Sequence, residues 1–271
     1  MFTGLSAFPL TPLDEDGIHK AAFTRLVTRL ATADVDAIAA LGSTGSYAYL
    51  TSEERAKVAR ITVQAAQGKP VIVGIGALRT RDVLQHAHDA QTAGADGLLL
   101  APVSYQRLTD EEVFGLFEDV TRAISIPLAV YDNPTTTGFT FSDELHTAIA
   151  NLPHVGAIKL PGGERIATLR KLVPAHVRLG VSGDWFAAEA LANGADVWFS
   201  VLGGLFPEAA RAVMDGADLE PLWDLFRRHG SVRVVATAAA LRGLTSEPNL
   251  PRPLRAAPAD EVAPVLEQLK L

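Results

Sequence analysis

The residue whose chemistry stands out in this sequence is Lys159, within the stretch Val155 to Gly163 that reads Val-Gly-Ala-Ile-Lys-Leu-Pro-Gly-Gly. An apolar run that ends in Pro and Gly predicts a short buried strand followed by a loop. A lysine at the end of such a strand is partly desolvated, which lowers its pKa because burial penalises the charged ammonium. The neutral amine is a nucleophile for carbonyl carbons and indicates a Schiff-base lysine. The alternative is a lysine whose ammonium reaches solvent.

Imine chemistry also needs a weak acid and base near the amine, because protons move when water leaves and when the adjacent carbon reacts. Tyr131 ends another apolar run and can shuttle protons if its phenol is linked to Thr44 and Tyr105. The turn Gly42-Ser43-Thr44-Gly45 supplies hydroxyls and backbone N–H groups that suit a small carboxylate. Taken singly, each feature has a structural alternative: a tyrosine at the rim of a core, and an ordinary turn.

The elements that must position these residues follow a repeated pattern of an apolar run, a loop with Gly, Ser or Pro, and an amphipathic helix rich in Ala and Arg. Eight runs alternating with helices predict an α/β protein with a parallel (β/α)8 TIM barrel. A doubly wound sheet is disfavoured because no G-x-G-x-x-G follows the first run. The predicted strands are Leu5 to Phe8, Ala37 to Leu41, Val71 to Ile75, Leu98 to Ala101, Leu128 to Tyr131, Ala157 to Lys159, Val177 to Val181 and Val197 to Val201.

Helix ends and the C-terminal region support this organisation. Thr51, Thr109 and Ser142 precede carboxylates and are predicted N-caps, while Gly94 and Gly194 suit left-handed C-caps. The strand signal stops after Pro207. We therefore expect a catalytic barrel over 1–217 and a helical region packed on it over 218–271. The helices predicted after Pro207 are Glu208 to Met214, Leu219 to Leu241 and Ala259 to Lys270, with a proline-rich loop at Ser246 to Pro258.

In a (β/α)8 barrel the loops that follow the strands form the active face. The residues that the sequence places there are the candidate site. They are Ser43, Thr44 and Gly45 after the second strand, Tyr105 after the fourth, Tyr131 and Thr136 at the fifth, Lys159 on the sixth, Gly183 and Asp184 after the seventh, and Phe199 and Ser200 on the eighth.

Composition excludes several classes of function. The net charge of −7, without a run of Lys or Arg, disfavours nucleic acids and membranes as partners. The absence of cysteine excludes disulfides, zinc-thiolate sites and cysteine nucleophiles. His86 and His88 are two residues apart and would point to different faces of a helix, so no metal site is expected. Met1 to Pro12 does not read as a signal sequence, and we expect a cytoplasmic protein.

The motifs jointly resemble the dihydrodipicolinate synthase and N-acetylneuraminate lyase family. They are the Gly-Ser-Thr-Gly turn followed by Leu50-Thr51-Ser52-Glu53-Glu54-Arg55, Tyr131-Asp132-Asn133-Pro134, Ile158-Lys159 and Ser182-Gly183-Asp184, and their order and spacing match from Gly4 to about Pro207.

The resemblance implies a class I aldolase or lyase that binds pyruvate, or a 2-keto acid cleaved to pyruvate, as an imine on Lys159. It implies that Tyr131 shuttles protons, that Ser43 and Thr44 hold the pyruvyl carboxylate, and that main chain near Phe199 contacts the same group. No metal or organic cofactor is implied. A homotetramer is implied, in which an aromatic residue after the fourth strand is donated across a dimer contact, with Tyr105 as the nearest candidate.

Departures from the family pattern concern the second substrate. Thr136 stands where the synthases of lysine biosynthesis carry an arginine that binds the aldehyde's carboxylate. The loss of that charge-assisted pair weakens the binding free energy of the aldehyde by roughly 1.5 to 3 kcal/mol. Ser104 is the ungapped match for the donated tyrosine, and Ser46 replaces a glutamate. Leu160-Pro161 follows the lysine, and Trp185 adds a bulky indole. A specificity outside lysine biosynthesis is therefore predicted, with 4-hydroxy-tetrahydrodipicolinate synthase as the alternative.

Two functions of other classes stay open at this point. Leu202-Gly203-Gly204 after the eighth strand could cradle a phosphate, which would indicate a phosphosugar isomerase or synthase. A keto-acid binding protein without turnover is the third hypothesis, motivated by the altered loops.

Overall fold

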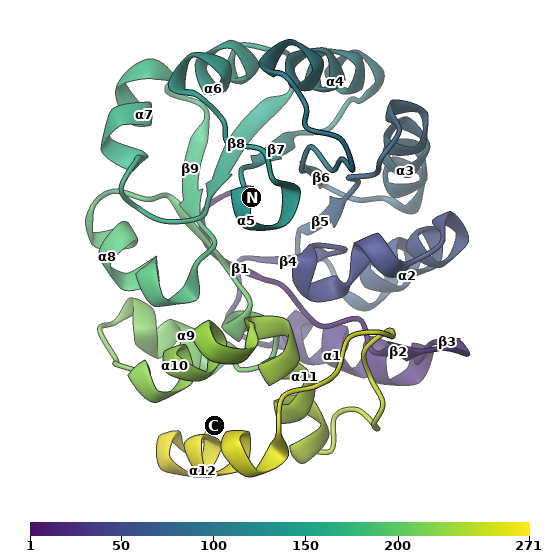
Figure 1. Cartoon of the computed structure of the whole chain (residues 1–271), viewed down its shortest axis with the longest axis vertical. Coiled ribbons are helices and arrows are strands. Elements are labelled where there is room, and N and C mark those ends of the chain that lie inside the picture. The colour runs from purple at the N-terminus through teal and green to yellow at the C-terminus, as the bar shows by residue number, and fades with distance from the viewer.

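The computed structural model describes all 271 residues and contains a closed barrel of parallel strands in the order β1-β10-β9-β8-β7-β6-β5-β4 (Figure 1). Each neighbouring pair is parallel, and β1 pairs with both β10 and β4, which closes the barrel. The predicted (β/α)8 fold is confirmed. The strands are β1 Gly4–Ala7, β4 Ala37–Ala40, β5 Val71–Gly74, β6 Gly97–Leu100, β7 Leu128–Tyr131, β8 Val155–Leu160, β9 Arg178–Val181 and β10 Val197–Ser200.

Helices surround the barrel, and a short antiparallel hairpin of β2 Leu13–Asp14 and β3 Gly17–Ile18 follows β1. The helices are α1 Lys20–Thr32, α2 Ser52–Ala65, α3 Thr80–Ala93, α4 Asp110–Ala123, α5 Pro134–Thr137, α6 Asp143–Ala150, α7 Ile166–Leu172, α8 Ala187–Ala192, α9 Pro207–Met214, α10 Glu220–His229, α11 Ser231–Leu241 and α12 Ala259–Leu269. Four 3₁₀ turns are η1 Ser43–Gly45, η2 Tyr47–Tyr49, η3 Asp184–Phe186 and η4 Leu202–Gly204.

Strand alternation sorts the core into two clusters. Along each strand, successive side chains point to opposite faces. Ala129 and Tyr131 of β7, and Val197 and Phe199 of β10, belong to an inner cluster of 12 buried residues, whereas their neighbours belong to a cluster of 67 that packs against the helices. Ala157 belongs to the inner cluster, so Lys159, two positions along β8, also points into the barrel.

The predicted helix caps are present. Thr51 and Thr109 each form a capping box with a glutamate three residues later, and Ser142 accepts the backbone N–H of Leu145. Gly94 and Gly194 have φ of 92° and 93°, the left-handed conformation that C-caps favour. These caps fix where the helices start and end, and therefore how long the loops at the strand ends can be.

The C-terminal helices pack together and onto the barrel, with α10 against η3 and α11 against η1 (Figure 1). The single helix predicted over Leu219 to Leu241 is wrong. Gly230, with φ of 83° and ψ of 134°, separates α10 from α11, because this left-handed extended conformation cannot continue a helix.

Candidate active site

Lys159 lies at the carboxyl-terminal mouth of the barrel and is 4% exposed. Its Nζ is 3.9 Å from the ring centroid of Phe8, 4.0 Å from that of Tyr131 and 5.6 Å from that of Phe199. Gly180 is its partner on β9, and a Cβ there would come within 2.6 Å of the Phe199 ring. The glycine therefore leaves room for the aromatic residues that enclose the amine.

Burial lowers the pKa of Lys159 to about 7, and the negative charge of Asp184 acts in the opposite direction. The physical cause is that the ammonium loses its hydration among aromatic rings. A lysine in this state is partly neutral near pH 7 and can attack a carbonyl carbon.

The Tyr131 hydroxyl lies beside polar groups from three loops. Asn133 Nδ2 donates to the phenol oxygen at 2.9 Å. Burial raises the pKa of Tyr131, and hydrogen bonding from Ser43, Asn133 and Ser182 opposes that rise. The register pairs Tyr131 with Lys159 across β7 and β8, which places the phenol beside the amine. Within one chain, no hydrogen bond joins the Tyr131 hydroxyl to Thr44 or Tyr105.

The η1 turn presents free backbone donors at the barrel mouth. Gly45 N and Ser46 N bond back to Gly42 and Ser43 within the turn, whereas the N–H groups of Ser43 and Thr44 donate to no other loop. Thr44 is buried and Ser43 is exposed. Two free N–H groups beside a hydroxyl can donate hydrogen bonds to a small carboxylate.

The η4 turn, in contrast, has its donors already used. Asp184 is 3% exposed, and its carboxylate accepts Trp198 Nε1 at 2.8 Å, Val201 N at 3.2 Å and Leu202 N at 2.7 Å. Gly203 N donates to Ser200 Oγ at 2.8 Å, and Gly204 N donates to the carbonyl of Val201. No N–H group of this turn is left for a phosphate. Asp184 and Ser200 hold the loop after β10.

Asp184 is also the acidic residue whose negative charge acts on the pKa of Lys159. Burial raises the pKa of Asp184 to about 6, and its hydrogen bonds and the charge of Lys159 oppose the rise. The carboxylate and the amine therefore favour each other's charged forms.

The other predicted residues lie at different depths in the barrel mouth. Phe199 is fully buried under Lys159, and Gly183 is half-buried at the start of η3. Thr136 is exposed on α5. Tyr105 is 92% exposed in the loop after β6, and no hydrogen bond within the chain joins it to Tyr131.

Sequence reasoning missed three residues of this site. Phe8 was counted only as the end of a strand, although its ring stacks closest to the amine. Ser182 and Asn133 were read as parts of motifs, yet both lie at the Tyr131 hydroxyl.

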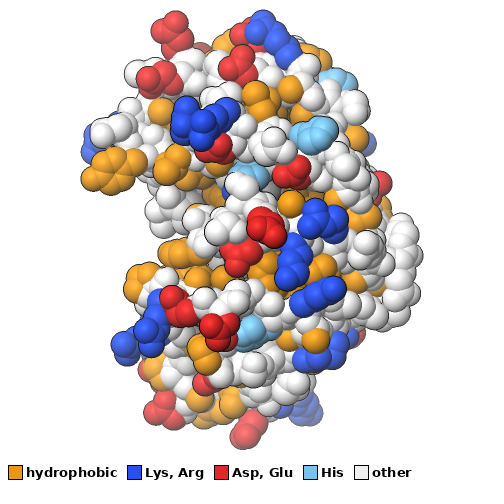
Figure 2. Space-filling model, turned by 90° about the vertical axis from the view of Figure 1, so that its right-hand side faces the viewer, with side chains coloured by type: hydrophobic (Ala, Val, Ile, Leu, Met, Phe, Trp, Pro, Cys, Tyr) orange, Lys and Arg blue, Asp and Glu red, His pale blue; other side chains and the backbone are white.

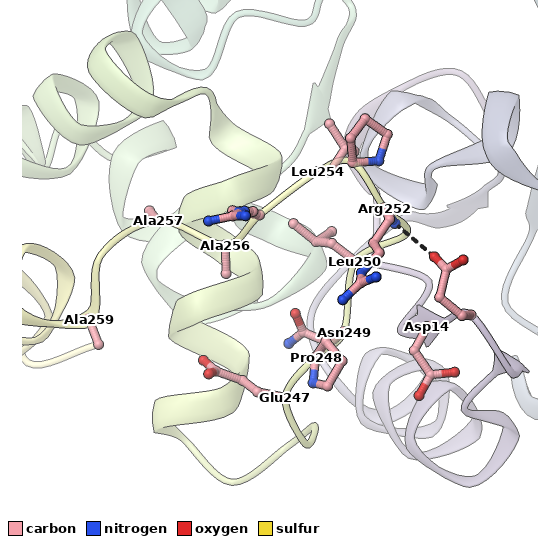
Figure 3. Close-up of a pocket in the computed structure, with 13 residues that line it drawn as sticks. Asp14, Glu247, Pro248, Asn249, Leu250, Arg252, Leu254, Ala256, Ala257 and Ala259 are labelled. Atoms are coloured by element: carbon pink, nitrogen blue, oxygen red, sulfur yellow. Dashed lines mark hydrogen bonds between the residues drawn. The ribbon is translucent and has the colours of Figure 1, made fainter.

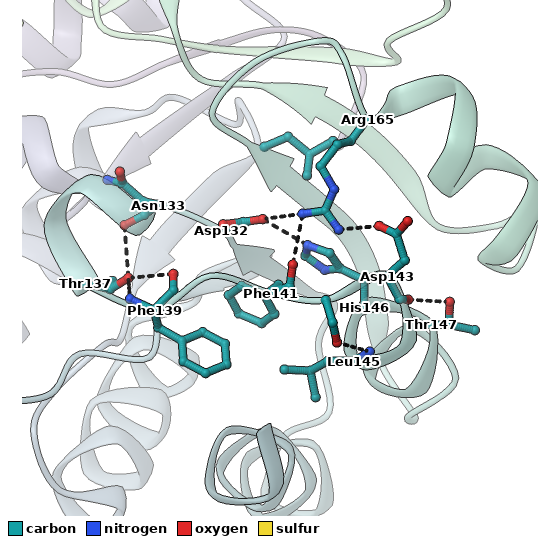
Figure 4. Close-up of polar contacts among 12 residues, drawn as sticks. Asp132, Asn133, Thr137, Phe139, Phe141, Asp143, Leu145, His146, Thr147 and Arg165 are labelled. Atoms are coloured by element: carbon teal, nitrogen blue, oxygen red, sulfur yellow. Dashed lines mark hydrogen bonds and ion pairs between the residues drawn. The ribbon is translucent and has the colours of Figure 1, made fainter. Parts of the chain in front are cut away.

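A polar network behind Tyr131 ties two of the active-face loops together (Figure 4). Asp132 Oδ2 lies 3.0 Å from His146 Nε2 and 3.2 Å from Arg165 NH1. Arg165, in the loop after β8, also donates to the Phe141 carbonyl at 3.1 Å and pairs with Asp143. The His146 ring stacks on Phe141 with centroids 4.6 Å apart. The loop after Tyr131 is thus fastened to the loop after Lys159.

Elsewhere the surface offers no comparable chemistry. A hollow of about 890 Å³ lies between Asp14, Glu15 and the segment 247–259, and shares no lining residue with the Lys159 site (Figure 3).

No three His, Asp or Glu residues are grouped to hold a metal ion. Acidic and basic side chains are interspersed over the face in Figure 2, where the outline is also hollowed on one side. No helix combines the length and apolar character needed to cross a membrane.

The sequence model of the Dihydrodipicolinate synthetase family matches residues 1–270. The chain belongs to this family. Its members are pyruvate-dependent class I aldolases and lyases, and the chain is an enzyme of that kind.

Individual relatives agree with the family assignment. The chain is similar to 4-hydroxy-tetrahydrodipicolinate synthase of Alkaliphilus oremlandii, with 29% identity over 268 residues, 93% of this chain and 92% of the relative. The crystal structure of dihydrodipicolinate synthase from Agrobacterium tumefaciens is 43% identical, with a TM-score of 0.93 over 99% of this chain and 97% of that one. A dihydrodipicolinate synthase from Acinetobacter baumannii, solved with pyruvate, is 25% identical, with a TM-score of 0.89 over 99% and 98%.

Proposed function

We propose that this family member forms a Schiff base between Lys159 and pyruvate, or a 2-keto acid that it cleaves to pyruvate. The observation that carries the proposal is a buried lysine whose pKa is lowered to about 7, beside a buried tyrosine on the neighbouring strand. The A. baumannii relative solved with pyruvate supports the same substrate class.

In the proposed cycle the neutral Nζ of Lys159 attacks the keto carbon, and a proton passes through Tyr131 to the carbonyl oxygen. The oxygen leaves as water, which gives the protonated imine. Loss of a proton from the adjacent methyl carbon gives the enamine, which adds to an aldehyde. Hydrolysis then frees Lys159. In the reverse direction the imine of the 2-keto acid breaks the same carbon–carbon bond.

The remaining roles follow from placement. The free N–H groups of Ser43 and Thr44, with Gly45 completing the turn, are proposed to hold the pyruvyl carboxylate. Main chain near Phe199 is proposed to contact the same group. Gly183 is proposed to line the same space, and Thr136 is proposed to face the second substrate without supplying a charge.

The identity of the second substrate distinguishes the two enzymatic activities that remain possible for this chain. An exposed threonine at position 136 favours an aldehyde other than the one used in lysine biosynthesis, because it cannot form the bidentate pair that an arginine offers to a carboxylate. The alternative is 4-hydroxy-tetrahydrodipicolinate synthase, as the A. oremlandii relative is named. A phosphosugar function is disfavoured because the η4 donors are already bonded.

We further propose a homotetramer in the cytoplasm, where pyruvate is produced. The exposed Tyr105 supports contact with another copy of the chain, since an apolar ring at 92% exposure gains from burial.

The test is treatment with pyruvate and borohydride, followed by intact mass and peptide mapping. We expect a reduced pyruvyl adduct on Lys159 and none in Lys159→Ala. An equal adduct in the variant, or none in the unaltered protein, would contradict the imine assignment. Adduct formation without turnover of any aldehyde or 2-keto acid would instead indicate a keto-acid binding protein.

A further inference from the structure

In the proposed cycle Tyr131 is a phenolate for part of each turnover, because it gives its proton to the departing oxygen before it takes one from the methyl carbon. We propose that Asn133 is the positioning residue for this step, with a side-chain amide that donates to the Tyr131 oxygen and stabilises its negative charge. The proposal rests on the imine function proposed above and adds the residue that decides how readily its proton shuttle ionises.

The Asn133 amide bonds to Tyr131 and not to the helix that begins beside it. Asn133 is the N-cap of α5, a position where asparagine commonly accepts a backbone N–H with its side chain, yet it makes no such bond. Its Nδ2 instead donates to the Tyr131 oxygen at 2.9 Å. An amide nitrogen can only donate, so this bond does not engage the phenol hydrogen, and it strengthens when the oxygen becomes negative.

The burial of Tyr131 makes a fixed donor valuable. Tyr131 is 6% exposed, so water solvates its phenolate poorly. Burial raises the pKa of Tyr131, and the bonds with Ser43, Asn133 and Ser182 oppose the rise. The two serine hydroxyls can either donate or accept, whereas the Asn133 nitrogen is a donor whatever the state of the phenol. The loss of a donor costs most where the charge it serves is buried.

The backbone of Asn133 is held on both sides. Its carbonyl accepts the N–H groups of Thr136 and Thr137, each at 3.1 Å, and the Thr137 hydroxyl at 3.0 Å. Figure 4 shows the amide on the side of Asn133 away from that hydroxyl. On the preceding side, Asp132 N donates to Lys159 O at 3.0 Å, and the Asp132 carboxylate is fixed by the polar network described above. The donor is therefore in place before the charge develops, which is the arrangement that stabilises it most.

The steps balance without a further reactant. The carbinolamine on Lys159 takes the Tyr131 proton and loses water, which leaves an iminium ion and a phenolate. The phenolate then takes a proton from the methyl carbon, which gives the enamine and restores the phenol. Asn133 keeps both of its amide hydrogens throughout, and its bond is strongest while the Tyr131 oxygen is charged.

The experiment follows exchange of pyruvate methyl protons with D₂O by NMR, which requires the imine and the enamine but no aldehyde. Asn133→Leu replaces the amide with an apolar side chain of similar size. We expect kcat for exchange to fall by roughly 10- to 100-fold, the effect of one hydrogen bond to a charged group, with KM for pyruvate within about twofold.

Asn151→Leu is the matched control. It removes an amide at the exposed end of α6, where Nδ2 donates to Thr147 O at 2.8 Å, and should exchange at the rate of the unaltered protein.

A second measurement separates phenolate stabilisation from a displaced loop. 3-Fluorotyrosine, incorporated in place of tyrosine, has a more acidic phenol and so replaces part of what the lost donor supplied. We expect it to raise the exchange rate of Asn133→Leu by a larger factor than that of the unaltered protein. The proposal is overturned if Asn133→Leu exchanges normally, or if fluorination changes both proteins by the same factor. A failed imine function is distinguishable, because the unaltered protein would then show neither exchange nor a borohydride adduct.

Discussion

The ionisation of Lys159 sets the pH dependence of the proposed reaction. The pKa of Lys159 is lowered to about 7 by burial, so the neutral amine grows as pH rises through that value. About a tenth of the amine is neutral at pH 6 and about nine tenths at pH 8. We therefore expect adduct formation with pyruvate to rise roughly tenfold between these values. The measurement is the rate of borohydride trapping at saturating reductant.

The ionisation of Asp184 and Tyr131 also affects the pH dependence of adduct formation. Asp184, whose pKa is raised to about 6, loses its proton just below the same range and favours the ammonium when it does so. Tyr131 stays protonated because burial raises its pKa. A rate that rises only near pH 10, as for an ordinary exposed lysine, would contradict the desolvated amine.

At the residue scale, the sequence indicates the reactive group but not its surroundings. Lys159 could be singled out because a charged residue ends an apolar run before Pro and Gly. Phe8, Ser182 and Asn133 could not be assigned, because their roles depend on which loops meet at the barrel mouth. Strand register and loop shape decide that, and neither is encoded in a local pattern.

At the scale of elements, Arg165 is the link between the loops that follow β7 and β8. Arg165→Ala removes its hydrogen bonds to Asp132 and the Phe141 carbonyl and leaves Asp132, which is 2% exposed, with His146 alone. We expect the free energy of unfolding to fall by about 1–3 kcal/mol, because a buried carboxylate loses one partner. Urea denaturation measures the change.

Arg178→Ala is the matched control for that measurement. The Arg178 side chain is 47% exposed and pairs with Asp196, so we expect a loss of about 0–1 kcal/mol. Equal losses in the two variants would mean that the Asp132 network contributes no more than a surface ion pair.

Helices and strands are the part of this fold that the sequence predicts best. All eight apolar runs are strands, because a parallel barrel buries both faces and leaves nearly continuous apolar stretches. The boundary at Gly230 was missed because the residues on both sides have helical patterns, and only the backbone conformation of the glycine separates them. The 3₁₀ turns η1 to η4 carry no periodic signal, although they position most of the site.

At the scale of the whole molecule, the exposed apolar residues predict how copies assemble. Tyr105 is 92% exposed and Leu78 is 67% exposed, and Leu78 lines a surface hollow with Val103 of the Tyr105 loop. If this surface joins copies of the chain, Leu78→Glu should lower the sedimentation-derived mass, because a carboxylate cannot be buried without a partner. Leu241→Glu, at a 43% exposed position on α11, should leave the mass unchanged. A monomeric unaltered protein would contradict the proposed tetramer.

The pairing of β1 with β10 has a consequence for how the protein is made. The barrel closes only when the strand that begins at Gly4 meets the strand that ends at Ser200. During synthesis, Lys159, Tyr131 and the η1 turn all leave the ribosome before that partner strand exists. Contacts between such distant positions form slowly, and unpaired strand edges are prone to aggregate in the meantime. One edge of the first strand, opposite the edge that pairs with β4, therefore stays without its partner until most of the chain has been translated.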